Sequence, residues 1–91
     1  MTQSKEQAIA RAKADLSKRL GIAENAISES SVENVDFPDM SLGAQEADEM
    51  SGQMISSGWR IRLNADGKIY EYRADANQLR LFQFRGTNYI V

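Results

Sequence analysis

The strongest structural constraint in this sequence is a short reversal near its end, where Asp66-Gly67 separates two segments of alternating polarity. Asp-Gly is a preferred centre for a two-residue hairpin loop, because both positions tolerate the positive φ angles of a type I′ turn. Centring the turn on this pair fixes the register of both strands, since a slip of one residue would exchange their faces. One face of the predicted hairpin then carries three apolar pairs: Trp59 with Ala74, Ile61 with Tyr72, and Leu63 with Tyr70.

A second turn at residues 75–78 predicts a third strand in the same sheet. Centred on Ala76-Asn77, it adds Leu79 and Leu81 to the same apolar face, because alternate residues of a strand share a face. Residues 85–91 are expected to form a loose tail, with docking of Tyr89-Ile90-Val91 on the domain left open as an alternative. The expected result is a three-stranded meander, with strands at about 58–64, 69–74 and 79–84.

An amphipathic helix is predicted at about residues 5–20. Ser4 and Gln7 have the spacing of a capping box, in which each side chain bonds the other residue's backbone N–H. Apolar residues then recur at helical spacing, and Gly21 stands where a helix commonly ends in a left-handed residue. The apolar stripe is narrow and rich in alanine, so we expect the helix to lie close against the flat apolar face of the meander.

A fourth strand is predicted at about residues 28–37, with a bulge near Ser30-Ser31 and an end before Pro38. Residues 39–58 have no clear period, and a loop of this length in a small domain needs a reason. The fold class is therefore predicted as α+β, with one N-terminal helix packed on a four-stranded antiparallel sheet (strand, long loop, three-stranded meander). Three methionines of the long loop are interpreted as flexible fillers over the sheet: Met40, Met50 and Met54.

The composition narrows the functions that this chain can perform. Its 91 residues suffice for a single domain and include neither cysteine nor histidine. Thiol nucleophiles, thiolate metal ligands and the commonest general base are therefore missing, and we expect no metal site and no cofactor. No apolar run approaches the ~20 residues that span a bilayer, and the first residues lack the apolar core of a signal peptide. These features predict a cytoplasmic protein, unless the chain is a trimmed piece of an exported one.

Charge is distributed unevenly along the chain, although the formal net charge is only −2. No Lys or Arg occurs from Glu24 to Glu49, a stretch with eight acidic residues. From Trp59 onward, six Lys or Arg residues stand against three acidic ones. This pattern is typical either of an acidic segment that folds beside a basic sheet or of a polarised surface for a charged partner.

The predicted register also defines the face of the sheet that points away from the helix. Arg60 lies opposite Arg73, and Arg73 lies opposite Arg80, so three arginines form a row with Phe82 and Phe84 beside it. Like charges directly opposite each other destabilise a sheet by roughly 0.2–1 kcal/mol per pair. Two interpretations stay open. In the first, counter-charges come from within the chain, either from the acidic 39–49 loop folding back on the row or from Glu29 and Glu33. In the second, an anionic partner binds the row.

Three segments carry a distinctive pattern, and its most specific part is Phe37-Pro38-Asp39 followed by Ser41-Leu42-Gly43. Over about residues 8–82 the chain resembles a small bacterial domain family of unknown function with a W/F-P-D-x-S-L-G pattern. Such domains are similar to PepSY-type modules, which are associated with envelope proteins and protease inhibition. The family pattern has cysteine where this chain has Ala44, so the disulfide that the resemblance implies for the long loop is absent here. The resemblance supplies no catalytic residues.

We expect a monomeric, non-enzymatic module that binds a protein or peptide or acts like an inhibitor. Two alternatives stay open: a small ligand-binding or hydrolase-like domain that uses the acidic 39–49 loop, and a structural domain without an activity of its own. The acidic pI of about 5.0 argues against a nucleic-acid partner, and no membrane association is expected. The expected binding residues are Arg60, Arg73, Arg80, Phe82, Phe84, Phe37, Asp39 and Leu42.

Overall fold

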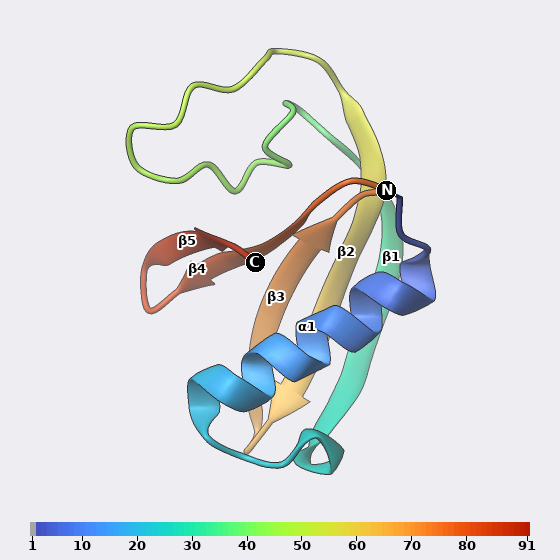
Figure 1. The fold of residues 1–91 in the computed structure, drawn as a ribbon, viewed down its shortest axis with the longest axis vertical. Coiled ribbons are helices and arrows are strands. Elements are labelled where there is room, and N and C mark those ends of the chain that lie inside the picture. Colours follow the sequence, from blue (N-terminus) through green and yellow to red (C-terminus); the bar gives the residue numbers. More distant parts are fainter. Residues whose placement is uncertain (1) are drawn as a thin grey trace.

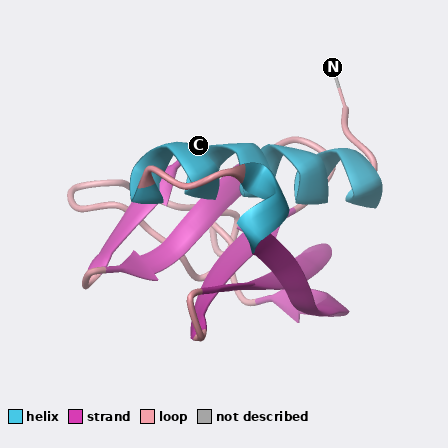
Figure 2. Cartoon of the chain, turned by 90° about the horizontal axis from the view of Figure 1, so that it is seen from below, coloured by secondary structure: helices cyan, strands magenta, loops and turns pink. Residues whose placement is uncertain are grey.

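A single α-helix lies across one face of a five-stranded antiparallel sheet in the computed structural model, which describes residues 2–91 (Figure 1). The strands lie in the order β1-β2-β3-β4-β5, so each strand pairs with its neighbour in the chain. Seen along the sheet, the helix and the strands form two separate layers (Figure 2). The elements are α1 (Lys5–Leu20), the short 3₁₀ helix η1 (Glu24–Ala26), β1 (Ile27–Phe37), β2 (Ser56–Ala65), β3 (Lys68–Ala74), β4 (Leu79–Phe84) and β5 (Thr87–Ile90).

The helix α1 has the predicted bounds and the predicted caps. The Ser4 backbone N–H donates to Gln7 Oε1 at 2.8 Å, and the Gln7 backbone N–H donates to Ser4 Oγ at 3.2 Å. Gly21 ends the helix in the left-handed region at φ 67°, which glycine adopts without the steric cost of a Cβ atom. The buried face of the helix consists of Ala8, Ala12 and Leu16.

The hairpin between β2 and β3 has the predicted register. Asp66 and Gly67 have φ angles of 53° and 76°, as a type I′ turn requires at both central positions. The pairing of β3 with β4 also agrees with the prediction, because Ala74 lies opposite Leu79 and Tyr72 lies opposite Leu81. The apolar face of the meander therefore points to α1, as the alternation predicts.

The predicted four-stranded sheet with a loose tail is wrong, because the last residues add a fifth strand. The chain reverses at Arg85 and Gly86, which both have positive φ angles, and β5 then pairs with β4. The Val91 N–H donates to the Leu79 carbonyl oxygen at 2.9 Å and fixes the end of the chain to the start of β4. The β4–β5 hairpin therefore uses the same backbone geometry as the β2–β3 hairpin, with Arg-Gly in place of Asp-Gly.

The strands β1 and β2 enclose a long loop whose two ends lie side by side. The predicted bulge in β1 is present, since the register with β2 shifts between Glu29 and Ser31. Phe37 pairs with Ser56, so residues 38–55 leave the sheet and return at adjacent points. Loops of this kind with adjacent ends pack on their own side chains and frequently carry function.

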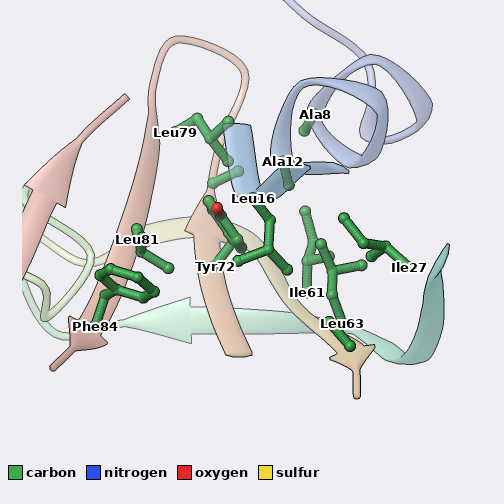
Figure 3. Packing of buried hydrophobic residues seen from close by; sticks show 12 residues of the cluster. Ala8, Ala12, Leu16, Ile27, Ile61, Leu63, Tyr72, Leu79, Leu81 and Phe84 are labelled. Carbon is green, nitrogen blue, oxygen red and sulfur yellow. The ribbon is translucent and has the colours of Figure 1, made fainter. Parts of the chain in front are cut away.

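The main core lies between α1 and the sheet (Figure 3). Tyr72, Ile61, Leu63 and Leu81 have no solvent exposure and meet the fully buried Leu16 of the helix. At roughly 1.5–3 kcal/mol for each large apolar side chain, this burial is the main stabilising contribution on the helix side of the sheet.

A smaller buried group lies outside this core. Phe37, Leu42 and Ala44 are almost completely buried but do not belong to the helix-side cluster. Phe37 ends β1, and the other two residues belong to the 38–55 loop. The loop therefore has a small core of its own, and its contacts with the arginine row define the candidate site.

Candidate functional site

The three arginines form the predicted row. Arg60 of β2 pairs with Arg73 of β3, and Arg73 pairs with Arg80 of β4. These positions alternate with residues of the helix-side core, so their side chains point to the opposite face of the sheet. Three cations on adjacent strands need counter-charges, and the structure provides them from two sources.

The first source is Glu71, which lies within the row on β3. Its Oε2 accepts a hydrogen bond from Arg73 Nε at 2.8 Å and lies 3.4 Å from Arg60 Nε without a hydrogen bond. Its Oε1 accepts a hydrogen bond from Arg62 Nε at 3.2 Å. One carboxylate therefore stabilises three guanidinium groups.

The second source is the acidic loop, which folds back onto Arg80. Arg80 Nη1 and Nη2 donate to the two carboxylate oxygens of Glu49 at 2.6 and 2.7 Å. Arg80 is only 6% exposed, and its Nη1 also donates to the Ala44 carbonyl oxygen at 3.3 Å. The Arg80 hydrogen bonds, followed by that from the Glu46 backbone N–H, lower the pKa of Glu49 to about 2. A bidentate ion pair of this kind holds the guanidinium and the carboxylate in one relative orientation.

Arg73 attaches a second point of the loop to the sheet. Its Nη1 donates to the Leu42 carbonyl oxygen at 3.1 Å. Its guanidinium carbon lies 3.6 Å from the centroid of the Phe82 ring and 5.6 Å from that of Phe37. Cation–π contacts add to the hydrogen bonds, so Arg73 connects β4, the end of β1 and the loop.

Asp39 shapes the turn at the start of the loop. Its Oδ1 accepts hydrogen bonds from the Ser41 N–H at 3.0 Å, the Ser41 hydroxyl at 2.8 Å and the Gly43 N–H at 3.0 Å. These bonds, led by that from Gly43, lower the pKa of Asp39. They also hold Leu42 at a φ of 60°, where a leucine is strained, with its side chain buried. The segment between Pro38 and Ala44 is therefore well anchored without a disulfide.

Phe84 does not belong to this face, and its predicted place beside the arginines is wrong. The pairing of β4 with β5 is irregular between Leu81 and Phe84, and Gln83 takes a φ of 48°. The irregularity breaks the alternation, so Phe84 points to the helix side and joins the main core next to Tyr70. The other seven predicted site residues gather around the arginine row, and ligand binding by them stays a prediction.

The interpretation of the loop methionines as fillers is also wrong. Met50 is 97% exposed, Met54 67% and Met40 49%, and the neighbouring Ile55 is 73% exposed. We call these four side chains the methionine patch. For Met50, Met54 and Ile55 the sequence signal is a lack of charge, since no charged residue occurs from Met50 to Trp59 in a chain that is 26% charged.

Three acidic side chains of the loop make contacts that hold the fold together. Residues 2–91 contain no group of three or more acidic side chains that could hold a metal ion. Asp39 and Glu49 each stabilise the loop through several hydrogen bonds, and Glu46 Oε2 accepts the Ile90 backbone N–H at 3.1 Å. These carboxylates serve the fold, with the Glu46 contact joining the loop to β5.

The fold and its anchored loop define a small α+β domain with one helix-covered face and one loop-covered face. The chain belongs to the family described as a domain of unknown function (DUF8738), whose pattern it matches over residues 9–82. Comparisons with curated proteins and with solved structures give no match. Within residues 2–91, no helix is long and apolar enough to cross a membrane.

Proposed function

We propose that this domain is a non-enzymatic module that binds another protein through the methionine patch. The observation that carries the proposal is the exposure of four large apolar side chains on one loop. Single exposed apolar residues are ordinary on protein surfaces, whereas a group of them on one loop is typical of an interaction site. Methionine suits this role because its flexible, polarisable side chain adapts to the shape of a partner.

The absence of charge from Met50 to Gly58 supports the same role. The centres of protein interfaces are depleted in charged residues and enriched in methionine. Residues 50–58 contain glycine, serine and glutamine between the apolar residues and no charged side chain. A partner with an apolar groove could therefore cover this segment without removing a charge from water.

The loop is also prepared for binding by its internal contacts. The Met40 N–H donates to the Gly52 carbonyl oxygen at 3.0 Å, and Gln78 Nε2 donates to the Met40 carbonyl oxygen at 2.6 Å. The ion pair between Glu49 and Arg80 holds the segment just before Met50. An ordered loop loses less conformational entropy on binding, which raises affinity.

An inhibitor-like role is the more specific form of this proposal. A protruding loop held by its scaffold is suited to occupying the groove of another protein, as the resemblance to bacterial PepSY-type modules also suggests. The hydrolase-like alternative receives less support, because Glu49 and Asp39 have lowered pKa values and are ionised near neutral pH. Neither can therefore serve as a proton donor there.

Photo-crosslinking followed by affinity measurement tests the proposal. A photoreactive residue at position 54 should capture a partner from the source cell, whereas one at position 69 should not. Ile69 is a matched control, because it is 51% exposed and lies at the first hairpin, outside the patch.

The purified partner then allows a quantitative comparison. The double variant Met54→Ser/Ile55→Ser should weaken binding by more than about tenfold, since each side chain loses apolar contact area. Ile69→Ser should leave the affinity within about twofold, and both variants should keep the stability of the wild type, because exposed positions contribute little to it. Equal effects of the two variants, or no effect of the first, would contradict the proposal.

A further inference from the structure

We infer that the free edge of β1 is a second interaction surface, which binds an extended, lysine- or arginine-rich segment of another protein as an added strand. The inference goes beyond the methionine patch and rests on a different part of the molecule. β1 forms the outer margin of the sheet, as Figure 1 shows at its right-hand side. It spans 11 residues and pairs on one side only, with β2.

The two edges of the sheet differ in how they are covered. At the opposite edge, β5 has only four residues, and the 38–55 loop already contacts it. Asn88 Nδ2 donates to the Gln45 carbonyl oxygen at 2.8 Å, and the Ile90 N–H donates to Glu46 Oε2 at 3.1 Å. No strand or loop of residues 2–91 pairs with the outer side of β1. An exposed row of backbone N–H and C=O groups is the feature that strand addition uses.

A groove beside this edge can receive the side chains of an added strand. It has a volume of about 500 Å³ and lies between the first half of α1 and β1. Ile9 and Val32 form its apolar part, and both are partly buried against the main core. In strand addition, backbone hydrogen bonds provide affinity and pockets for alternate side chains provide specificity. The groove reaches β1 only at Glu29 and Val32, and its other charged lining residues are Lys5, Glu6, Lys13 and Glu24. It therefore fits one apolar side chain of the partner, beside Val32.

The charge of β1 identifies the other side chains of the partner. Glu29, Glu33 and Asp36 are exposed along the strand, and Glu24 precedes it. Glu29 lies 3.4 Å from Lys13 Nζ and Glu33 lies 3.6 Å from Arg62 Nη1, but both ion pairs are open to water. Exposed pairs of this kind are weak, so their carboxylates can turn to a cationic ligand.

The same charges act against a second copy of this chain as the occupant. Pairing two β1 strands would bring the acidic residues of one close to those of the other, and like charges across paired strands are destabilising. Glu29 and Asp36 point to the same face of β1 as Val32, whereas Glu33 points to the other face. A lysine- or arginine-rich segment with one apolar residue beside Val32 therefore satisfies both the acidic edge and the groove. We therefore assign this surface to such a segment.

A designed lysine-rich peptide with one valine, placed to lie beside Val32, tests the inference with the full chain. Titration followed by NMR should shift the backbone amides of residues 28–36 and of Ile9. A peptide with alternate amides N-methylated should not bind, because it cannot form the strand ladder. A peptide with glutamate in place of lysine should not bind either, because it repels the acidic edge.

Charge variants test whether the peptide binds at the β1 edge or elsewhere on the molecule. Glu29→Gln/Asp36→Asn should weaken peptide binding roughly fivefold, a loss in the range expected for two exposed ion pairs. Asp48→Asn/Asp66→Asn removes the same charge from two exposed turn residues and should leave the affinity unchanged. Met54→Ser/Ile55→Ser should also bind the peptide normally, so failure of the first proposal does not affect this one.

Four results would overturn the inference. They are binding that survives N-methylation, equal effects of the two acidic double variants, shifts that centre on the methionine patch, and no binding at millimolar peptide. Analytical ultracentrifugation adds a further check. A dimer that the β1 variants disrupt would identify a second copy of the chain as the occupant and would also overturn it.

Discussion

At the scale of single residues, Tyr72 illustrates how a polar atom is stabilised in the main core. Tyr72 has no solvent exposure, and its hydroxyl donates to Asp15 Oδ2 at 2.7 Å. The same oxygen accepts a hydrogen bond from Arg19 Nε at 2.7 Å. Burial, followed by the hydrogen bond to Asp15, raises the pKa of Tyr72 well above its ordinary value, so the hydroxyl stays a neutral donor. This network joins the centre of β3 to α1.

Tyr72→Phe should therefore lower the free energy of unfolding by about 1–2 kcal/mol. The phenylalanine ring keeps the packing, while Asp15 loses a buried donor and keeps only Arg19 and water. Urea denaturation measures the change. Tyr70→Phe is the matched control, because Tyr70 lies on the same strand and is only partly buried, and it should change stability by less than about 0.5 kcal/mol. Equal losses in the two variants would show that the Asp15 hydrogen bond contributes nothing.

At the scale of elements, the 38–55 loop depends on a few anchoring contacts. Replacing Glu49 by Gln keeps its size but removes the charge that pairs with Arg80. Hydrogen exchange should become at least tenfold faster at the Ala44 and Glu49-position amides, which donate within the loop, and stay unchanged in β2 and β3. Asp48→Asn is the control, because Asp48 is exposed and adjacent in sequence. Unchanged protection of the loop in the Glu49 variant would contradict the anchoring role.

The hairpin between β4 and β5 provides another test at this scale. Gly86 has a φ of 83°, and a Cβ atom added there would meet no other atom within 4 Å. Gly86→Ala should therefore lower the free energy of unfolding by about 1–2 kcal/mol through backbone strain alone. Gly67→Ala should cost a similar amount, because Gly67 has a φ of 76° and equally open surroundings. Thermal or urea unfolding compares the two. A loss at position 86 far below that at position 67 would mean that β5 adds little to the stability of the sheet.

Strong local signals explain which elements could be predicted from the sequence. The capping box and Gly21 fixed α1 to its observed bounds, and Asp66-Gly67 fixed the register of the meander. The same register gave the arginine row, because side chains alternate strictly along an undistorted strand. These features depend on residues close together in the chain, where turn and cap preferences are strong.

The incorrect predictions concern features for which the local sequence carries a weak signal or none. Arg85 is not a preferred first residue of a type I′ turn, so the β4–β5 hairpin had no clear signal in the sequence. The left-handed conformation of Gln83 moves Phe84 from the arginine face of the sheet to the helix face. Glutamine rarely adopts this conformation, so the sequence does not predict it. The exposure of Met50 depends on how the whole loop folds over the arginines, which no local pattern encodes.

At the scale of the whole molecule, the two faces of the sheet are covered in different ways. The helix face is apolar and contains the main core, whereas the loop face combines a small apolar group with ion pairs. Burial of apolar surface varies little with pH, but the pairs of the loop face need ionised carboxylates. Acid should therefore weaken the loop face while the helix core keeps its contacts.

The pH dependence follows from Glu49. Its pKa is lowered from 4.5 to about 2 in the folded protein, chiefly by its hydrogen bonds with Arg80. A lowered folded pKa contributes stability that is fully present above 4.5 and is lost as the pH falls toward about 2. Urea unfolding at a series of pH values should show the wild type more stable than Glu49→Gln near neutral pH. The difference in free energy of unfolding between the two proteins should decrease steadily from pH 4.5 to about 2, because Glu49→Gln has no carboxylate to protonate at this position.

Asp39 and Asp48 separate this contribution from general effects of acid. Asp39 also has a lowered pKa and is present in both proteins, so protonation of the Asp39 carboxylate should lower the stability of both in the same direction. Asp48→Asn should follow the wild-type curve throughout, because Asp48 is exposed and does not contact the arginine row. A gap between wild type and Glu49→Gln that stays constant from neutral pH to about 2 would mean that the Arg80 pair contributes through shape and not through charge. The loop face would then be insensitive to acid, and its anchoring would depend on the Arg73 and Asp39 hydrogen bonds.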